Sequence, residues 1–502
     1  MFEKKRLHPI AIVTNILAEI KEFILPIIVF LFLWIKGDKI NLWFLLISVS
    51  VVFVWVIGAI ISWFRFVYWL EDREVRIESG VFVRKKRYIP FDRIQSISTT
   101  QGILQRLFDL VKMTIETAGG ETEAVLTAIP RSDAERIQRY IKEAKKEHAL
   151  SDPVQESEGS AGVVHLEAPE VKRREKVFSL SMGEVFLVAV TSGGALGVIA
   201  GVAAFASEIG EYLPLDWIFA RFMQSVKNDF YTAVLIVLFA LIIAYLIAII
   251  QSMLKYAHFT VEKTDKHLIV SHGLLERRSV SIPLNRVQGF IIYEGIIRKI
   301  FGLATIALIN AGISDKDEFT GEVILAPLIK RSECAGLMKK CLPEFTVDVP
   351  FTPVPARSKS RYILRPLYIV AVPVLAGLFF LKVWGFILLF LLPVLAYFGY
   401  KAYEFAGWNI SGKQLVLRSR FFNARTVYVM KHRIQSLDVH RSWFQRRKQL
   451  TTIRAYILSG SGVSAGKTID VAEEDAEKIY RWFQKERDAE RNEEIEIMQE
   501  VE

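Results

Sequence analysis

The sequence predicts a multi-pass α-helical membrane protein that carries three β-rich water-soluble modules. Three observations lead to this fold class. Apolar and polar residues are segregated along the chain, the long apolar runs come in pairs, and one motif recurs three times, each time downstream of such a pair. With 52% hydrophobic residues among 502, the chain is too apolar for an ordinary soluble protein. Because 24% of it is charged, membrane spans must alternate with soluble segments.

Six apolar runs form the three pairs of predicted spans. Most of them approach or exceed the roughly 17–25 residues that cross the hydrocarbon of a bilayer, although the first is short. Because two spans return the chain to the side on which it started, both termini and all three copies of the motif are expected on one side. The pairs are Phe23–Ile35 with Leu42–Phe64, Val185–Ala206 with Phe230–Ile250, and Leu367–Leu381 with Trp384–Tyr400.

The distribution of Lys and Arg indicates which side this is. Segments 65–180, 255–365 and 401–502 are dense in both residues, whereas the connectors within the pairs hold few. By the positive-inside rule we expect both termini and the modules in the cytoplasm, and the protein in the plasma membrane. The net charge of +10 then reflects loops that lie against anionic lipid, and no nucleic-acid partner is expected.

The recurring motif reads IPFDRIQSISTTQGILQRLF from Ile89, IPLNRVQGFIIYEGIIRKIF from Ile282 and VMKHRIQSLDVHRSWFQRRK from Val429. Offsets of 193 and then 147 residues align the three copies without gaps. Matches spread over this distance indicate an internal repeat. The matched polar positions are Arg93, Arg286 and Arg433, then Gln95, Gln288 and Gln435, then Arg106, Lys299 and Arg446.

The residues around each copy of the motif follow one plan. Alternating apolar residues around a turn predict a β-hairpin before the motif, and a second pair of strands around a polar turn after it. An amphipathic helix closes the copy, so each module is expected to be a small, partly open barrel or bent sheet capped by a helix. The hairpins are 73–90, 266–283 and 413–430, the strand pairs 112–130, 305–327 and 451–471, and the helices 132–146, 330–342 and 472–487.

The I-P-x-x-R-[IV]-Q core, the following x-G-[IL]-[LI]-x-[RK]-[LI]-F and a downstream A-G-[GI] resemble the bacterial pleckstrin-homology-like (PH-like) domain of the second class. Pairs of spans alternating with three such domains are similar to the YdbT-type membrane proteins. The resemblance implies a PH-like barrel with a C-terminal helix in each module, and a smaller single-module membrane protein as partner. The third copy departs from the pattern, with Met430 in place of Pro and Arg447-Lys448 in place of an apolar pair.

With this resemblance the expected domain organisation has nine parts. They are 1–66 for the N-terminus and first span pair, 67–148 for PH-like domain 1, 149–180 for a linker, 181–254 for the second span pair, 255–345 for PH-like domain 2, 346–365 for a second linker, 366–401 for the third span pair, 402–487 for PH-like domain 3 and 488–502 for an acidic tail.

Two interpretations are open for the polar residues of the motif. The nine matched residues are expected to hydrogen-bond turns within their own module, since Arg and Gln carry several donors, or else to contact a ligand or partner. In the short helix that follows, Ile103, Leu104, Leu107 and Phe108 share one face. We expect this face to plug its own barrel; the alternative is a wedge on the bilayer surface.

Two basic clusters are candidates for contact with the membrane surface. The third copy of the short helix contributes Trp443, Phe444, Arg447 and Lys448, and the first hairpin contributes Arg84, Lys85, Lys86 and Arg87. A hairpin near an anionic leaflet collects cations in any case, each worth about 1 kcal/mol. Nonspecific proximity to lipid is therefore favoured over a specific headgroup site.

One predicted span presents a strip of small residues. Gly193, Gly197 and Gly201 lie four residues apart, which lets another helix approach closely. The partner helix is expected within this protein, or else in another membrane subunit. The six apolar cores contain no Asp, Glu, Lys, Arg or His, which argues against an ion-coupled transporter.

No catalytic or metal-binding constellation is found, so no enzyme activity and no cofactor are expected. The segment Gly460–Thr468 imitates a phosphate-binding loop, but it falls on a predicted strand–turn–strand. Cys334 and Cys341 stand two helical turns apart, roughly 10 Å, which is too far for a disulfide.

These observations predict a bacterial plasma-membrane scaffold. Its three cytoplasmic PH-like modules would bind a partner protein, such as the smaller relative, or membrane lipid headgroups. A homo-oligomer is a separate expectation. Envelope protection against membrane-active peptides is consistent with the resemblance. The alternative function is a component of a transport or export complex.

Overall fold

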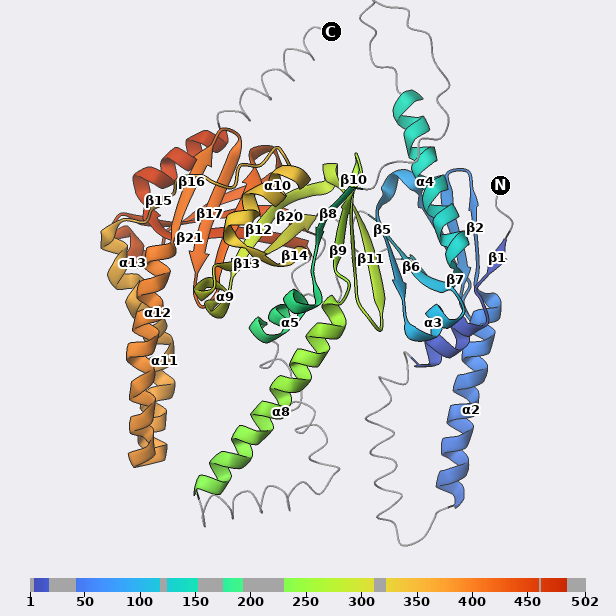
Figure 1. The fold of residues 1–502 in the computed structure, drawn as a ribbon, viewed down its shortest axis with the longest axis horizontal. Helices are drawn as coiled ribbons and strands as arrows, with labels where there is room; N and C mark the ends of the chain where they lie inside the picture. The colour runs from blue at the N-terminus through green and yellow to red at the C-terminus, as the bar shows by residue number, and fades with distance from the viewer. Residues whose placement is uncertain are drawn as a thin grey trace, which may run out of the picture. The chain divides into compact units, whose positions relative to one another are not determined.

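The computed structural model describes residues 4–17, 42–117, 124–151, 175–192, 230–310, 322–459 and 462–484 (Figure 1). The chain divides into two compact units. The first comprises Met1–Arg174, Ser179–Thr260 and Ile269–Ser281, and the second comprises Glu175–Phe178, Val261–Leu268 and Ile282–Glu502.

The strands expected from the repeat are present in all three modules. Strands of the first unit are β1 (Lys5–Arg6), β2 (Val67–Glu71), β3 (Glu74–Ser79), β4 (Lys85–Pro90), β5 (Ile94–Gln101), β6 (Leu110–Thr117), β7 (Ala124–Pro130) and β11 (Arg277–Pro283). Those of the second are β12 (Val287–Glu294), β13 (Leu303–Asn310), β14 (Glu322–Lys330), β15 (Thr352–Pro353), β16 (Gly407–Ser411), β17 (Gln414–Arg420), β18 (Ala424–Met430), β19 (Ile434–His440), β20 (Leu450–Ser459) and β21 (Gly462–Ala472). The division between the units runs through β8 (Glu175–Ser179), β9 (Thr260–Lys263) and β10 (His267–His272), and it leaves the last two residues of β11 in the second unit.

Sheet pairing joins each module to the next one. The first unit has a four-stranded sheet in the order β1-β2-β3-β4, and β11 of the second module pairs antiparallel with β5 of the first. This second sheet has the order β7-β6-β5-β11-β10-β9-β8. The second unit has a seven-stranded sheet in the order β14-β13-β12-β18-β17-β16-β15 and a three-stranded sheet in the order β19-β20-β21.

The two joints between modules, β11 on β5 and β18 on β12, have the same register. In the first joint Ser281 lies opposite Ile97. Moving each residue to the next copy of the repeat, by 147 and 193 residues respectively, gives Tyr428 opposite Phe290, which is the pair found in the second joint. One strand pairing therefore repeats along the series of modules.

The sequence did not predict two short strands that precede apolar helices. In β1, Lys5 pairs with Tyr68 of β2, and in β15, Thr352 pairs with Trp408 of β16. The chain of the third module thus leaves from β15, runs through the apolar helices and returns beside its point of departure. Close approach of these strands explains Gly407, where a Cβ atom would lie 2.8 Å from the Thr352 carbonyl oxygen.

The apolar helices that the structure describes follow the predicted runs in part. Three helical segments are long and apolar enough to cross a membrane, Val234–Tyr256, Ala356–Phe380 and Leu388–Phe405, and two shorter apolar helices are Phe53–Arg65 and Met182–Thr191. Expected runs Phe23–Ile35 and most of Val185–Ala206, with Gly193, Gly197 and Gly201, lie outside the described residues. The helices are α2 (Leu42–Arg65), α5 (Met182–Thr191), α8 (Phe230–Tyr256), α11 (Lys359–Leu381), η5 (Lys382–Phe390) and α12 (Leu391–Phe405).

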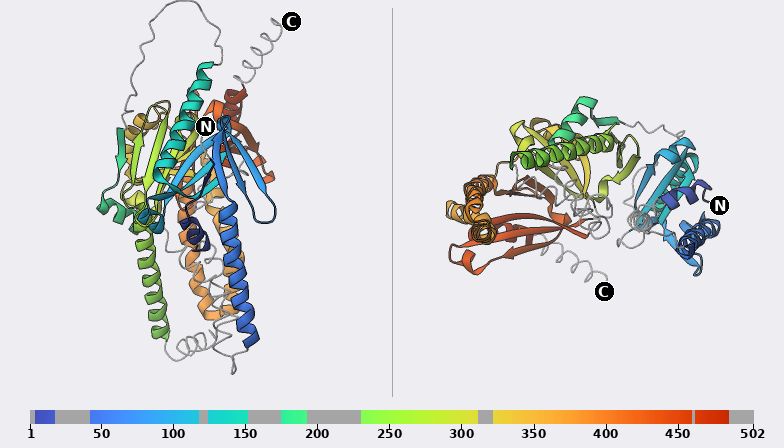
Figure 2. Two further views of the ribbon diagram at one scale, coloured as in Figure 1. Left: turned by 90° about the vertical axis from the view of Figure 1, so that its right-hand side faces the viewer. Right: turned by 90° about the horizontal axis from the view of Figure 1, so that it is seen from below.

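The third pair of apolar helices packs as a tight hairpin (Figure 2). A Cβ atom at Gly399 of α12 would lie 2.5 Å from the Tyr362 carbonyl oxygen of α11. Between the helices, a Cβ atom at Gly385 would lie 2.6 Å from the Gly377 carbonyl oxygen. The segment between the helices is the 3₁₀ helix η5, and α12 begins at Leu391, seven residues beyond the predicted Trp384.

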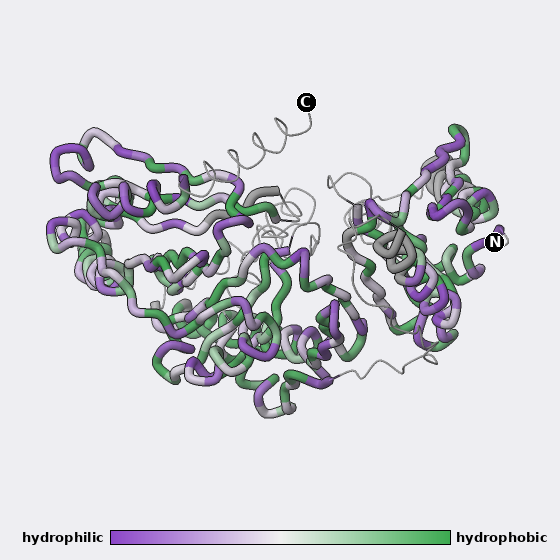
Figure 3. The backbone as a smooth tube through the Cα atoms, turned by 90° about the horizontal axis from the view of Figure 1, so that it is seen from above, coloured by the Kyte–Doolittle hydropathy of each residue, from purple (hydrophilic) through white to green (hydrophobic). Residues whose placement is uncertain are grey.

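A helix closes each module, as the sequence predicts. These are α4 (Arg131–Ser151), α10 (Cys334–Cys341, preceded by the 3₁₀ turn η3 at Arg331–Glu333) and a helix over 473–484. In the first unit Ile137 and Ile141 of α4 join the same buried core as Met113. Burying each such side chain contributes about 1.5–3 kcal/mol. Figure 3 shows hydrophobic and hydrophilic stretches alternating along the backbone.

Two smaller predictions are confirmed. Both Cys334 and Cys341 are free, and burial raises the pKa of each thiol to about 11. The segment that imitates a phosphate-binding loop lies in the β20–β21 hairpin, with Tyr456 opposite Ala465.

Candidate functional site

A short helix follows the motif strand in each module and presents apolar side chains outward. These helices are α3 (Ile103–Leu107), α9 (Ile296–Ile300) and α13 (Trp443–Arg446). The expectation that the apolar face plugs the barrel is wrong, because these side chains are exposed by between 37% for Ile296 and 77% for Leu107 and Ile300. The full set is Ile103, Leu104, Leu107, Phe108, Ile296, Ile297, Ile300, Phe301, Trp443 and Phe444.

A long polar side chain faces inward from each short helix instead. Gln105, Arg298 and Gln445 occupy the same position of the repeat, and the two glutamines are buried. Gln105 Nε2 donates to the Thr127 carbonyl at 2.8 Å, and Arg298 Nη1 donates to the Pro327 carbonyl at 3.0 Å.

The acceptors lie where the last strand of the module is irregular. Pairing of β6 with β7 shifts between Val111 and Met113, and that of β13 with β14 shifts beside Ala304. A bulge leaves backbone groups without ladder partners, and the inward side chain satisfies one of them. This anchor fixes the helix so that its apolar side chains point away from the barrel.

Sequence reasoning singled out the neighbouring residue of each helix. Arg106, Lys299 and Arg446 are all exposed, and Lys299 Nζ lies 4.5 Å from the ring centroid of Phe405, at the end of α12. A long polar residue at position 105 and its equivalents, within an apolar turn in all three copies, was the available signal for the anchor.

The Arg and Gln residues of the motif take different positions. Arg93, Arg286 and Arg433 end the 3₁₀ turns η1 (Phe91–Arg93), η2 (Leu284–Arg286) and η6 (Lys431–Arg433). Gln288 Nε2 donates to the Arg286 carbonyl at 3.2 Å, a bond within its own turn. Arg433 Nη2 donates to the Asn285 carbonyl at 2.8 Å, so it reaches the turn of the preceding module.

The other motif residues do not gather into one site. Arg93 and Gln435 are exposed, and the side chain of Gln95 lies outside the described residues. A hydrogen-bonding role in turns therefore stays a prediction for these three.

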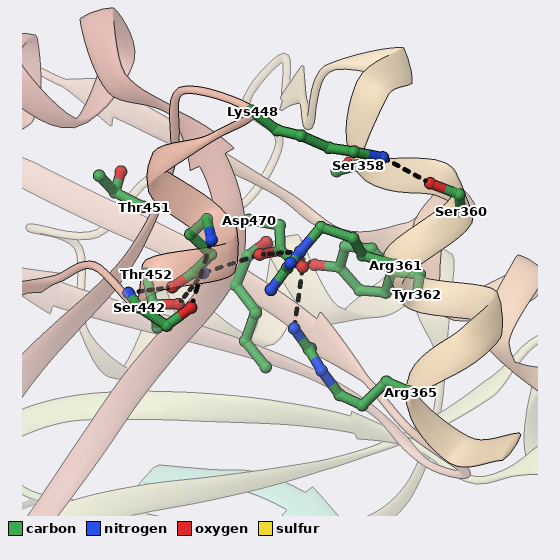
Figure 4. A network of polar contacts seen from close by, with 12 residues as sticks. Ser358, Ser360, Arg361, Tyr362, Arg365, Ser442, Lys448, Thr451, Thr452 and Asp470 are labelled. Atoms are coloured by element: carbon green, nitrogen blue, oxygen red, sulfur yellow. Dashed lines mark hydrogen bonds and ion pairs between the residues drawn. The ribbon is translucent and has the colours of Figure 1, made fainter. Parts of the chain in front are cut away.

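The third module is tied to the first turns of α11 by a buried carboxylate (Figure 4). Asp470 of β21 is fully buried, and its oxygens lie 3.2 Å from Arg361 Nε and 2.9 Å from Arg365 Nη2. Gln445 Nε2 donates to the same carboxylate at 2.7 Å. Tyr362 OH donates to the Ile469 carbonyl at 2.6 Å. Three elements, α11, α13 and β21, thus meet at one anion, which makes a rigid junction between helix and module.

The exposed residues of α13 lie beside this junction. Lys448 Nζ donates to Ser360 Oγ at 3.0 Å, and Arg357 Nη2 donates to the Gln449 carbonyl at 3.1 Å. The guanidinium of Arg447 lies 3.8 Å from the Trp443 ring centroid. Trp443, Phe444, Arg447 and Lys448, one of the two predicted basic clusters, are therefore assembled next to the start of an apolar helix.

The second basic cluster lies on the hairpin of the first module. Lys85, Lys86, Arg87 and Tyr88 are exposed on β4, at the edge of its sheet. Arg84 and Lys86 both pair with Glu78, the latter at 3.8 Å. Part of this positive charge is thus compensated within the module. Among the described residues no group of three or more His, Cys, Asp or Glu could hold a metal.

Comparisons with known proteins agree with this repeat. A family model described as bacterial PH domain matches residues 17–145, 197–344 and 363–487. The chain is 37% identical over 497 residues to the UPF0699 transmembrane protein YdbT of Bacillus subtilis (strain 168), covering 96% of this chain and 98% of that protein. It is 30% identical over 96 residues to the UPF0699 transmembrane protein YdbS of the same organism, 18% of this chain and 59% of that protein. No solved structure matches.

Proposed function

The chain belongs to the UPF0699 family of transmembrane proteins, whose repeated unit is the bacterial PH domain, and from that premise we propose that it is a multi-pass plasma-membrane scaffold. Its three modules lie on the cytoplasmic face of the bilayer, with both termini. There they contact lipid headgroups through their short helices and present their remaining surface to a partner protein.

The observation that carries this proposal is the outward apolar face of α3, α9 and α13. Leaving Leu107 or Ile300 three-quarters exposed to water is unfavourable, whereas insertion into the headgroup boundary recovers about 25 cal/mol for each Å² of apolar surface covered. In α13 the aromatic pair Trp443 and Phe444 is flanked by three cations, and aromatic and basic residues together favour the interface.

The neighbours of the short helices support the same placement. Phe108 beside α3 lies 6.4 Å, between ring centroids, from His8 in the segment that leads to the first apolar run. Lys299 of α9 lies against the end of α12, and Lys448 beside α13 reaches the start of α11. If those apolar helices cross the bilayer, each short helix lies at the level where a helix enters it.

The expected pairs of spans and the distribution of charge support a cytoplasmic position for all modules. The pairing of β15 with β16 returns the chain to the same edge of one sheet after α11 and α12, which supports an even number of crossings. Lys and Arg are dense in the modules, as expected on the inner side.

The proposed partner is a smaller protein of the same family with one module. YdbS matches this chain over 96 residues, the length of about one module. Protection of the envelope against membrane-active peptides is part of the proposal on the resemblance alone. The expected phenotype of a deletion strain is increased sensitivity to such peptides.

Membrane contact is tested with the full chain in lipid nanodiscs. A polarity-sensitive dye is attached at Phe444→Cys, with Glu474→Cys on the closing helix as the control. Native Cys334 and Cys341 are buried with raised pKa values and label slowly. A nitroxide lipid should quench the dye at 444 and not at 474, also in 1 M salt, where the Debye length is about 3 Å. Equal quenching of both dyes by a water-soluble quencher would contradict the proposal.

The transport alternative predicts a different result. Purified chain in sealed liposomes would move a solute across the bilayer, and substitutions within α11 and α12 would abolish that movement. A scaffold moves no solute and tolerates single polar substitutions there.

A further inference from the structure

One strand of the first module and one strand of the third lie at the ends of the series of modules. Each lacks the neighbouring strand that its equivalents in the other modules have. In the described residues, β4 lies at the edge of the sheet β1-β2-β3-β4, and β19 lies at the edge of the sheet β19-β20-β21. Their equivalents β11 and β18, and β5 and β12, all pair across a joint. An edge strand presents backbone N–H and C=O groups that can bind a further strand.

The register of the joints predicts how these two strands would pair. Five residue pairs are common to both joints. Transferred by the repeat offsets onto β4 and β19, they place Tyr88 opposite Leu437 and Arg87 opposite Asp438. The remaining pairs are Lys86 with Val439, Lys85 with His440, and Arg84 with Arg441.

Two of the five opposed pairs are complementary. Arg87 and Asp438 have opposite charge, and Tyr88 and Leu437 form an aromatic–aliphatic pair; each directly opposed pair contributes about 0.2–1 kcal/mol. Arg84 and Arg441 have the same charge, but each is already paired with a carboxylate of its own module, Glu78 and Glu473. A slip by one residue would bring Asp438 opposite Lys86 or Tyr88 and move every side chain to the other face.

We propose that β19 of one chain pairs with β4 of a second copy, so that the protein assembles head to tail through the joint it already uses twice internally. Among the described strands neither β4 nor β19 has a neighbour on its outer side. The β4 of a second copy can therefore take the place beside β19 that β11 takes beside β5. Such an interface is heterologous and gives a closed ring or an open row. It does not depend on the lipid contact proposed above.

Disulfide cross-linking of the full-length chain tests the pairing. One tagged version carries Arg87→Cys, a differently tagged version carries Asp438→Cys, and the two are co-expressed. Directly opposed residues have Cβ atoms about 4.5–5.5 Å apart, close to the distance a disulfide needs. We expect a mixed disulfide that contains both tags. Arg87→Cys with Leu437→Cys is the matched control, since Leu437 points to the opposite face of the strand and should link at least several-fold less.

Charge reversal gives a second measurement that does not use cysteine. Asp438→Arg or Arg87→Asp alone should weaken self-association in detergent about tenfold, the effect of roughly 1.4 kcal/mol, and the double exchange should restore it. Analytical ultracentrifugation reports the association constant. Three outcomes overturn the proposal: a monomer at every concentration, no mixed disulfide between the two tagged versions, or equal linking of the control pair. Loss of dye quenching in the lipid test with intact cross-linking would reject only the membrane contact.

Discussion

The joint between the second and third modules and the two outer edges of the series use equivalent strands with different side chains. In the joint, the rings of Phe290 and Tyr428 stack with centroids 4.4 Å apart and planes at 6°, and both are fully buried. At the edges the equivalent residues are Leu437 and the half-exposed Tyr88. A buried apolar joint suits a contact that forms once, during folding of one chain.

The outer edges carry the features of strands that must stay soluble alone. Lys85, Lys86 and Arg87 on β4 and Asp438 on β19 are exposed, and charge on an edge strand discourages indiscriminate pairing. The opposite charges of Arg87 and Asp438 favour the transferred register over one that places Asp438 opposite Tyr88. The comparison therefore separates permanent pairing inside the chain from selective, reversible pairing at its ends.

Truncation of the stacked ring should have the largest effect. Tyr428→Ala removes a fully buried aromatic side chain and should lower the free energy of unfolding of the second unit by about 3–5 kcal/mol. Tyr88→Ala, at the equivalent position of the open edge, should cost about 1 kcal/mol or less. Denaturant unfolding in detergent measures both. Similar losses for the two variants would erase the distinction between joint and edge.

Neutralising the buried carboxylate of Asp470 in the third module should have the second-largest effect on stability. Asp470→Asn keeps the shape and leaves Arg361 and Arg365 facing a neutral amide, at a cost of roughly 2–4 kcal/mol. That figure lies below the value for a fully buried pair because the two arginine side chains are 21% and 36% exposed. Hydrogen exchange at the start of α11 should accelerate with it. The control Glu473→Gln removes an exposed pair and should change stability by less than about 1 kcal/mol; unchanged exchange in Asp470→Asn would show that the junction is not rigid.

Adding one methyl group at Gly289 tests how closely β12 and β18 approach each other in the joint. A Cβ atom at Gly289 would lie 2.4 Å from the Tyr428 carbonyl oxygen, so Gly289→Ala must push β12 away from β18 and should cost about 1–3 kcal/mol. The equivalent residue of the open edge is the exposed Ser436, and Ser436→Ala should be neutral. Thermal unfolding compares the two variants. A neutral Gly289→Ala would mean that the strands of the joint lie farther apart.

The smallest predicted effect is a pH dependence at the same joint. Burial raises the pKa of Glu322 above 4.5, and the hydrogen bond from Tyr293 and the charge of Arg425 only partly oppose this. The folded state then holds the proton more tightly than the unfolded state. The free energy of unfolding contributed by the protonated Glu322 carboxyl is therefore lost as the pH rises from 4.5 through the raised pKa. The loss is at most about 1.4 kcal/mol for each pH unit. Glu322→Gln should remove this pH dependence of the unfolding midpoint. If the midpoint of the unsubstituted chain instead rose with pH over this range, the predicted direction would be wrong.

Much of the fold could be predicted from the repeat alone. Alternating apolar residues in 73–90, 266–283 and 413–430 predicted the hairpins. The strand pairs and closing helices were predicted from the same plan in each copy of the repeat. The two-residue strands β1 and β15 could not be predicted, because two residues carry no periodicity. The strand pairing between modules could not be predicted from the sequence either. The apolar pattern of a strand is the same whether its partner strand lies in the same module or in the next one.

The candidate site was harder to predict because its contacts are long-range. Asp470 lies 109 residues from Arg361, and nothing near it in the sequence marks a buried anion. The orientation of the short helices was mistaken because their apolar spacing suggested burial, whereas Gln105 and its equivalents fix the helix from the opposite side. The exposed apolar face is what points to the membrane.

The claim that modules are joined by one repeated strand pairing is tested most directly by hydrogen exchange on the full-length chain in dilute detergent solution, resolved by strand. The amides of β5 and β12 should exchange slowly, as central strands of continuous sheets do, while those of β4 and β19 exchange fast and become protected as the protein concentration rises. Fast exchange throughout β5 and β12 would show that neighbouring modules are separate barrels linked only by the chain.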